Sequence, residues 1–278
     1  MKSVVVTGAT SGIGRATALD LAAHGYQVIA TARSTGQADK LLAAAAERGH
    51  SLRTVLLDVT EASSCTRAAA EVEEQTGGGP WALVNNAGLA HAGAFEDVSE
   101  EAARAVLEVN VLGAARMARL VLPAIRRRGG GRIVNMSSVG GLLTLPFNGW
   151  YCASKHALEA LTDALRMETA ADGVRCTLIE PGFIDTPMLE TGLADMPTDS
   201  RYAESYRTAR RLITAASPTA PEAVARTVRR ALTARTPRRR YRVGRTTTLT
   251  PFIRVLPQGL VDHMACRALG LAAAQDPR

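Results

Sequence analysis

The stretch that decides the fold is Thr7-Gly8-Ala9-Thr10-Ser11-Gly12-Ile13-Gly14. It follows the β-branched run 3–7 and precedes a helical segment that begins near Arg15. Glycines in such a turn let the backbone approach an anion, whose charge then lies at the N-terminus of the helix. A loop that needs glycine only for flexibility is the alternative. Because this is the first strand-to-helix turn of the chain, we expect it to bind the pyrophosphate of a dinucleotide through Gly8, Ser11, Gly12, Ile13 and Gly14.

Short apolar or β-branched runs alternate along the chain with longer segments that show helical spacing. Such alternation predicts a parallel sheet with helices on both faces. We therefore expect an α/β fold of the Rossmann-like type, a doubly wound parallel sheet of about seven strands flanked by helices in a single domain. The strands are expected at residues 3–7, 27–31, 52–58, 82–85, 132–137 and 175–180, with a last short strand at Val243.

The composition is that of a globular chain with a strong arginine bias. Of its 278 residues 46% are apolar and 21% charged, which supports a large core and argues against disorder. The formal net charge is +7, and among 33 basic residues only Lys2, Lys40 and Lys155 are lysines. The charge suits an anionic ligand such as a phosphorylated cofactor, although a bias toward Ala and Arg also fits genomic composition.

Cysteines, histidines and hydropathy point to no metal site and no membrane span. The histidines are isolated and no apolar run is long enough to cross a bilayer. The cysteines lie far apart without ligand spacing, so we expect neither zinc nor a disulfide framework, and a reducing cytoplasm fits best. They are Cys65, Cys152, Cys176 and Cys266.

A dinucleotide site needs a residue after the second strand that contacts the adenosine ribose. A carboxylate there binds the 2′-hydroxyl, whereas a basic residue accommodates a 2′-phosphate. Here the strand is followed by Arg33, and no carboxylate occurs until Asp39. Arg33 therefore predicts NADP(H) in preference to NAD(H), with Ser11 as a second donor. The alternative is that Arg33 is one of many arginines on a solvated turn.

Tyr151 and Lys155 stand four residues apart in a helical segment that reaches about Asp172, so both side chains lie on one face. A nearby cation lowers the pKa of a phenol, which makes the pair suitable for proton transfer. Such spacing also occurs by chance in ordinary helices. Here the lysine is one of few, and Ser138 ends a predicted strand thirteen residues before Tyr151, at the edge of the sheet where ligands bind.

In their order along the chain these motifs resemble the single-domain short-chain dehydrogenase/reductase family over roughly the first 190 residues. The stretch from Ser138 to Lys155 is locally similar to 17β-hydroxysteroid and retinol dehydrogenases. The resemblance implies an NAD(P)-dependent oxidoreductase acting on CH–OH groups. Besides the glycine turn and the Tyr151–Lys155 pair, it rests on Asp58-Val59, Asn85-Asn86-Ala87-Gly88, Asn110, Ser138 and Pro181-Gly182 through Thr186.

Roles carried over by this resemblance are the following. Ser138, chosen over Ser137 by its interval to the tyrosine, would orient the substrate oxygen, and Tyr151 would exchange a proton with it. Lys155 would bind the nicotinamide ribose and lower the pKa of the phenol, while Asn110 would help to hold a relay water. The remaining cofactor contacts would be Asp58 and Val59 at the adenine, Asn86, Ala87 and Gly88 on the adenosine side, and Pro181, Gly182 and Thr186 at the nicotinamide.

A substrate must reach Tyr151 between residues 140–147 and the segment after Thr186. We expect residues 187–217 to form a lid and residues 245–278 a C-terminal extension. The apolar lining predicts a large apolar molecule that carries one ketone, aldehyde or alcohol group and is steroid-like, retinoid-like or polyketide-like. The alternative is that these side chains only pack the lid onto the body. They are Leu142, Leu143, Leu145, Pro146, Phe147, Trp150, Met188, Leu189, Leu193 and Met196.

Two other functions use the same features. A non-catalytic NADP-sensing regulator could be built on the same fold, but the intact set of Asn110, Ser138, Tyr151 and Lys155 favours an enzyme. The arginine-rich run 237–242 resembles a nucleic-acid patch, yet it lacks interleaved aromatic residues and is expected at a solvated or interface edge, so no nucleic acid is expected. The resemblance implies a homodimer or homotetramer through the helices that contain Asn110 and Tyr151.

Overall fold

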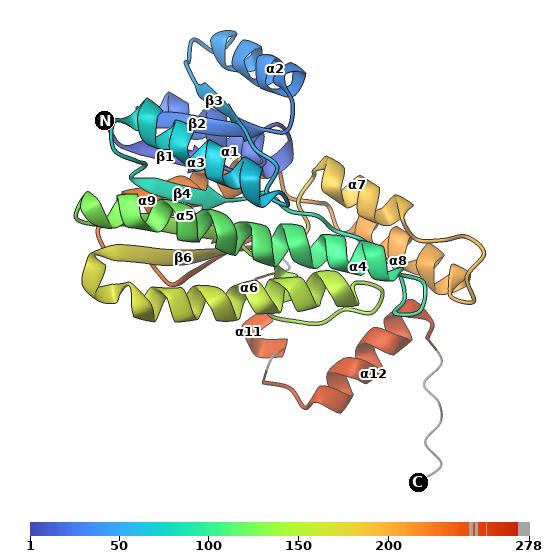
Figure 1. Ribbon diagram of the computed structural model, residues 1–278. Helices are drawn as coiled ribbons and strands as arrows, with labels where there is room; N and C mark the ends of the chain where they lie inside the picture. Colours follow the sequence, from blue (N-terminus) through green and yellow to red (C-terminus); the bar gives the residue numbers. More distant parts are fainter. Residues whose placement is uncertain (245–246, 248–249, 254, 272–278) are drawn as a thin grey trace.

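The computed structural model describes residues 1–244, 247, 250–253 and 255–271. Within them seven parallel strands form one sheet in the order β3-β2-β1-β4-β5-β6-β7 (Figure 1). The predicted fold class is confirmed. The strands are β1 Ser3–Val6, β2 Gln27–Ala32, β3 Arg53–Leu56, β4 Ala82–Asn85, β5 Gly131–Met136, β6 Val174–Pro181 and β7 Arg240–Val243.

Helices follow the strands and cover the sheet on both faces (Figure 1). A π-helical turn, Glu108–Gly113, joins α4 to α5, and 3-10 turns lie at Val139–Gly141 and Ala170–Asp172. The α-helices are α1 Gly12–Ala23, α2 Thr35–Ala46, α3 Ala62–Thr76, α4 Glu100–Leu107, α5 Ala114–Arg127, α6 Gly149–Glu168, α7 Pro187–Ala194, α8 Ala203–Ala215, α9 Pro221–Thr233, α11 Thr250–Ile253 and α12 Gln258–Leu269.

The core has two layers, one on each face of the sheet. Successive strand residues point to opposite faces, so Val4 and Val6 pack with α1 and α9, whereas Val5 packs with α3 and α5. All three valines are fully buried. This explains why the strands read as continuous apolar runs rather than alternating ones.

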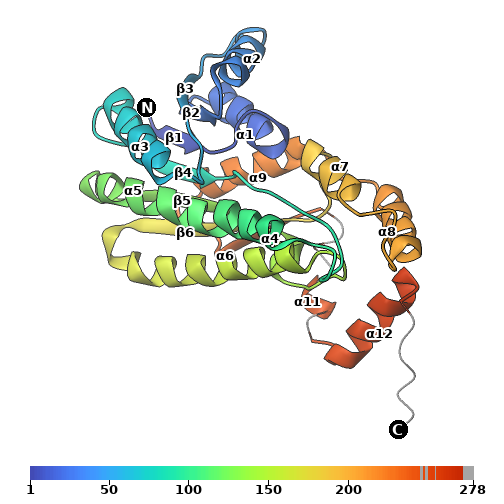
Figure 2. The same cartoon turned by 45° about the vertical axis from the view of Figure 1, so that its right-hand side comes forward.

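A third cluster lies apart from the sheet and joins the late helices to the body. Phe147, Tyr206 and Ala209 are buried together, and Leu269 of α12 packs against them. The Phe147 and Tyr206 rings meet edge to face with centroids 4.7 Å apart. In Figure 2 α12 lies beside α8, on the same side of the molecule as α7.

Two elements differ in extent from the sequence expectation. The third strand ends at Leu56 rather than Asp58, because the Asp58 carboxylate accepts hydrogen bonds from Thr60 N and Thr60 Oγ1 and turns the chain. The helix expected to reach Asp172 ends at Glu168 and continues as the 3-10 turn before Gly173, whose φ of 69° is left-handed. Within the described residues, no helix is both long and apolar enough to cross a membrane.

Candidate active site

A cavity of about 860 Å³ lies at the carboxyl ends of the strands. The strand order reverses between β1 and β4, and the turns after both strands line this cavity. Ligands of open α/β sheets bind at such a reversal. The predicted site residues that line it are Gly8, Ser11, Gly12, Ile13, Arg33, Asp58, Val59, Asn86, Ala87, Gly88, Ser138, Tyr151, Lys155, Pro181, Gly182 and Thr186.

The glycine turn forms one wall of the cavity at the N-terminus of α1. Gly8 and Gly12 have φ of 62° and 48°, a left-handed backbone that side chains disfavour. Gly14 does not line the cavity, but a Cβ there would lie 2.1 Å from the Gly8 carbonyl oxygen. Gly14 therefore allows helix and turn to approach each other.

Hydrogen bonds tie the turn after β4 to the turn after β1. Thr7 Oγ1 accepts from Asn86 N and from Ala87 N, both at 2.9 Å. Asn86 Nδ2 donates to the carbonyls of Thr7 and Gly8 at 3.0 and 3.1 Å. The side-chain amide of Asn86 thus holds the glycine turn in place.

Arg33 and Asp58 lie at the far end of this wall, after β2 and β3. The Arg33 side chain is exposed and lines the cavity. Hydrogen bonds from Thr60 hold the pKa of Asp58 below its ordinary value, with a smaller contribution from the Arg33 charge. The Arg33 guanidinium and the Asp58 carboxylate, which accepts hydrogen bonds from Thr60, thus both lie where the turn after β2 borders the cavity.

These residues fit a dinucleotide. Ser11 makes no side-chain capping hydrogen bond to α1, so the first amides of the helix stay available at the cavity. Such amides bind phosphate oxygens, and the helix dipole favours the negative charge. The left-handed glycines remove the side chains that would block a close approach. The described part of the chain contains no group of side chains that could ligate a metal ion.

Tyr151, Ser138 and Lys155 meet in the opposite wall. Tyr151 and Lys155 project from one face of α6, and the lysine Nζ lies 5.5 Å from the centroid of the phenol ring. Ser138 follows β5, where its Oγ accepts a hydrogen bond from Gly140 N at 3.1 Å. The expected lowering of the Tyr151 pKa by Lys155 is not found: burial raises the pKa of the phenol, and a hydrogen bond with Ser138 opposes that shift. The phenol is thus neutral at neutral pH.

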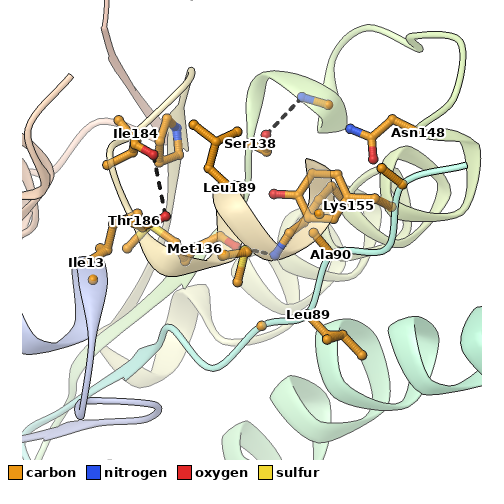
Figure 3. Close-up of a pocket in the computed structure, with 18 of the residues that line it drawn as sticks. Ile13, Leu89, Ala90, Met136, Ser138, Asn148, Lys155, Ile184, Thr186 and Leu189 are labelled. Carbon is orange, nitrogen blue, oxygen red and sulfur yellow. Dashed lines mark hydrogen bonds between the residues drawn. The ribbon is translucent and has the colours of Figure 1, made fainter. Parts of the chain in front are cut away.

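Lys155 is a buried ammonium held by a backbone carbonyl. It is 5% exposed, and its Nζ donates to the Met136 carbonyl at 2.9 Å (Figure 3). Burial lowers its pKa to about 8, and the charge of Glu159, one turn along α6, raises it in opposition. Because this pKa lies above neutral pH, Lys155 is still mostly charged there, and the Glu159 charge helps to keep it so.

Asn110 lies behind this wall and does not line the cavity. Its Oδ1 accepts from Leu89 N at 2.8 Å, and its Nδ2 donates to Leu89 O at 2.8 Å and to Ser154 Oγ at 2.9 Å. The side-chain amide thus braces the turn after β4 against α6. The π-helical turn around Asn110 places it at this junction. A part in a water relay stays a prediction.

Apolar side chains line the remainder of the cavity. Seven of the ten residues named from the sequence lie in its wall, whereas Leu142, Leu143 and Trp150 do not. Trp150 instead stacks on the exposed Phe95 ring, with centroids 5.9 Å apart. The seven are Leu145, Pro146, Phe147, Met188, Leu189, Leu193 and Met196.

Two features escaped the sequence reasoning. Ala265, Ala268 and Leu269 of α12 line the cavity, although three small or apolar residues mark no site by themselves. The arginine-rich run 237–242 carries Arg240, which bonds Glu159 Oε2 at 2.9 Å and lies 3.2 Å from the fully buried Glu180 carboxylate. Arg240 of the basic run thus balances the charge of the buried carboxylates of Glu159 and Glu180. Its strand, β7, lies at an edge of the sheet, as expected.

A comparison with family models matches residues 2–196 to the short chain dehydrogenase family. The chain belongs to this family of oxidoreductases. Human 17-beta-hydroxysteroid dehydrogenase type 1 is 38% identical over 237 residues, which is 80% of this chain and 71% of the relative. The uncharacterized oxidoreductase YbbO of Escherichia coli is 35% identical over 264 residues, 95% and 93% of the two chains.

Solved structures agree with this assignment. A short-chain dehydrogenase from Streptomyces avermitilis superposes with a TM-score of 0.79 at 35% identity, over 96% of this chain and 94% of the other. An alcohol dehydrogenase from Thermococcus sibiricus, solved with 5-hydroxy-NADP, gives 0.73 at 29% identity, over 87% and 96%. A relative from Burkholderia phymatum, solved with NAD, gives 0.80 at 27% identity, over 95% of both chains. Structural neighbours thus bind either nucleotide.

Proposed function

We propose that this protein interconverts a ketone or aldehyde and the corresponding alcohol on an apolar substrate, with NADP(H) as its preferred cofactor. The observation that carries the proposal is the meeting of Tyr151, Ser138 and Lys155 in the wall of a cavity that also contains the glycine turn. A proton donor and an anion-binding helix end then face one space, as hydride-transfer chemistry requires. An intact set of this kind favours an enzyme over a regulator.

The chain's own residues would act on the substrate oxygen. In reduction, the hydroxyl of Ser138 holds the carbonyl oxygen, and the neutral phenol of Tyr151 donates its proton as negative charge develops there. The buried ammonium of Lys155 stabilises the resulting phenolate. In oxidation the phenolate takes the proton back. When bound, the nicotinamide supplies the hydride in reduction and accepts it in oxidation.

The preference for NADP(H) rests on Arg33. Its exposed guanidinium lines the cavity after β2, at the position where a 2′-phosphate lies in folds of this kind. Gly8, Ser11, Gly12 and Ile13 would bind the pyrophosphate, and Asp58 and Val59 would border the adenine. Asn86, Ala87 and Gly88 would line the adenosine side, while Lys155, Pro181, Gly182 and Thr186 would border the nicotinamide end.

We also propose a cytoplasmic homodimer or homotetramer. The four cysteines are unpaired thiols, which suits a reducing compartment. Leu112, beside Asn110, and Leu161 of α6 are 52% and 46% exposed on the helices through which assembly is expected. Size-exclusion chromatography with light scattering measures this state directly.

The test of the function is a panel of carbonyl compounds and alcohols, followed by the absorbance of NADPH and of NADH. Steroid-like, retinoid-like and polyketide-like ketones should be turned over more efficiently than small sugars or hydroxy acids, because the cavity wall is mainly apolar. NADPH should be the better cofactor. Turnover confined to polar substrates, or a preference for NADH, would contradict the proposal.

A further inference from the structure

The late part of the chain builds a region of the cavity that offers no polar side chain. Within the described residues, every one from Pro187 onward that lines the cavity is apolar or glycine. This region differs from the walls around Tyr151 and Arg33, where polar and charged groups face the cavity. The side chains that define it are Ala209, Leu212 and Ile213 of α8 and Ala265, Ala268 and Leu269 of α12.

Two charged side chains near this region, Arg210 and Asp195, make polar contacts of their own. The Arg210 guanidinium donates to the Met196 carbonyl at 2.7 Å. Asp195, at the end of α7, lies 3.1 Å from His91, which belongs to the loop after β4. Arg210, Asp195 and His91 do not line the cavity, so their side chains offer a ligand no hydrogen bond in the region between α8 and α12.

Three of the side chains that line this region are those of alanines, which leave space between α8 and α12. Ala209 lies on α8, whereas Ala265 and Ala268 are three residues apart on α12 and so share one face. Leu269 completes that face and packs against Phe147 and Tyr206. In Figures 1 and 2 the C-terminal end of α12 lies next to α8. A narrow hydrocarbon fits between such faces better than a polar group does.

We propose that the substrate carries a hydrocarbon tail without polar groups, and that this tail binds between α8 and α12. This inference rests on the proposed function. Ala265 then sets how long a tail the enzyme accepts. A hydroxyl group at the end of the tail would leave water and find no partner among these side chains, which is unfavourable. Each methylene that is buried instead improves binding by roughly four-fold.

The first experiment compares methyl ketones of increasing tail length, from butanone to dodecan-2-one. The kcat/KM should rise steeply with each added methylene and then level off. 12-Hydroxydodecan-2-one, which differs from the longest ketone only by a terminal hydroxyl, should be at least ten-fold less efficient. Equal efficiency of these two compounds would overturn the proposal.

The second experiment narrows the region from α12. Ala265→Trp should lower kcat/KM for dodecan-2-one at least ten-fold and leave butanone unchanged, because only the tail reaches this position. Met264→Trp is the matched control, since Met264 is the neighbouring residue, is 58% exposed and does not line the cavity. Ala265→Leu is the milder variant if the tryptophan disturbs folding. An Ala265 variant that treats both ketones as the wild type does would contradict the inference.

Binding without turnover separates this inference from the function on which it rests. Dodecan-2-one should raise the melting temperature of the wild type and of Met264→Trp, but not that of Ala265→Trp. If no ketone is reduced while this binding pattern holds, the proposed function fails and the tail site stands. If ketones are reduced but the melting temperatures of both variants respond alike, the tail site is wrong.

Discussion

The two halves of the cavity are built in different ways. The half made by the strand ends depends on glycines and on hydrogen bonds to backbone amides, such as those that Thr7 Oγ1 accepts from the turn after β4. The half made by the late helices consists of apolar side chains that pack around Phe147 and Tyr206. The family match covers residues 2–196 and so includes α7 but not α8 or α12 of the second half. The chemistry is therefore shared with the family, and we expect substrate choice to depend on the late helices.

The difference predicts how variants will behave. Changes at the strand ends should alter the chemical step or the cofactor for every substrate. Changes in the late helices should alter the Michaelis constant for large apolar substrates and leave small ones nearly unaffected.

Replacing Tyr151 with phenylalanine should have the largest effect. The ring and its packing remain, but the transferable proton is lost, so turnover should fall by two or more orders of magnitude while the cofactor still binds. Steady-state kinetics and nucleotide titration measure the two quantities. Tyr26→Phe serves as the control, because Tyr26 stacks on Trp81 outside the cavity. A Tyr151→Phe enzyme of wild-type activity would rule out the mechanism.

Arg33→Asp should change the cofactor preference by an estimated ten- to hundred-fold. The substitution replaces attraction of a 2′-phosphate with repulsion, and a carboxylate there can bind the 2′-hydroxyl of NAD(H). Dissociation constants of NADPH and NADH, measured by fluorescence without substrate, give the ratio directly. Arg67→Asp makes the same charge change at an exposed position of α3 that does not line the cavity, and it should leave the ratio unaltered. An unchanged ratio in both variants would remove Arg33 from the site.

Glu159→Gln should shift the pH dependence of reduction. The wild-type rate should fall as the pH rises through about 8, where Lys155 loses its proton. The Glu159 charge raises the pKa of Lys155, so its removal should move this fall to lower pH. Asp163→Asn is the control, because Asp163 also pairs with Arg240, at 2.6 Å, but is not among the groups that shift Lys155. A fall that stays in place, or moves upward, would contradict this coupling.

The sequence could place the strand-end residues at one edge of the sheet for a physical reason. Buried parallel strands need continuous apolar runs, and their carboxyl ends meet at one edge, so residues such as Ser138 and Arg33 could be assigned to a common cavity. The confirmed sheet follows from the same pattern. The boundary at Asp58 was wrong by two residues, because a carboxylate that caps a turn is not visible in an apolar pattern.

Contacts between distant elements could not be read from local patterns. Arg240 meets Glu159 across 81 residues of sequence, and nothing in the arginine-rich run distinguishes it from its exposed neighbours. Likewise, Ala265 and Ala268 gain meaning only because α12 folds back beside α8. Trp150 could have been cavity wall or packing, and its stacking on Phe95 decides for packing.

Met188→Ala should have the smallest effect and the narrowest one. Met188 lies in the late half of the cavity and is 37% exposed. Its terminal methyl carbon is 3.4 Å from where a Cβ on Gly88 would lie. Because the side chain is only partly buried, its loss should raise the Michaelis constant for a bulky apolar ketone by about two- to five-fold with little change in kcat or in stability. Met167→Ala, at a 65% exposed position on α6, controls for the loss of a surface methionine. Phe147→Ala would raise the same constant, but it also removes a buried ring from the cluster that holds the late helices, so its melting temperature would fall as well. If Met188→Ala instead lowers kcat for large and small ketones alike, the late half takes part in the chemical step, and the division between the two halves does not hold.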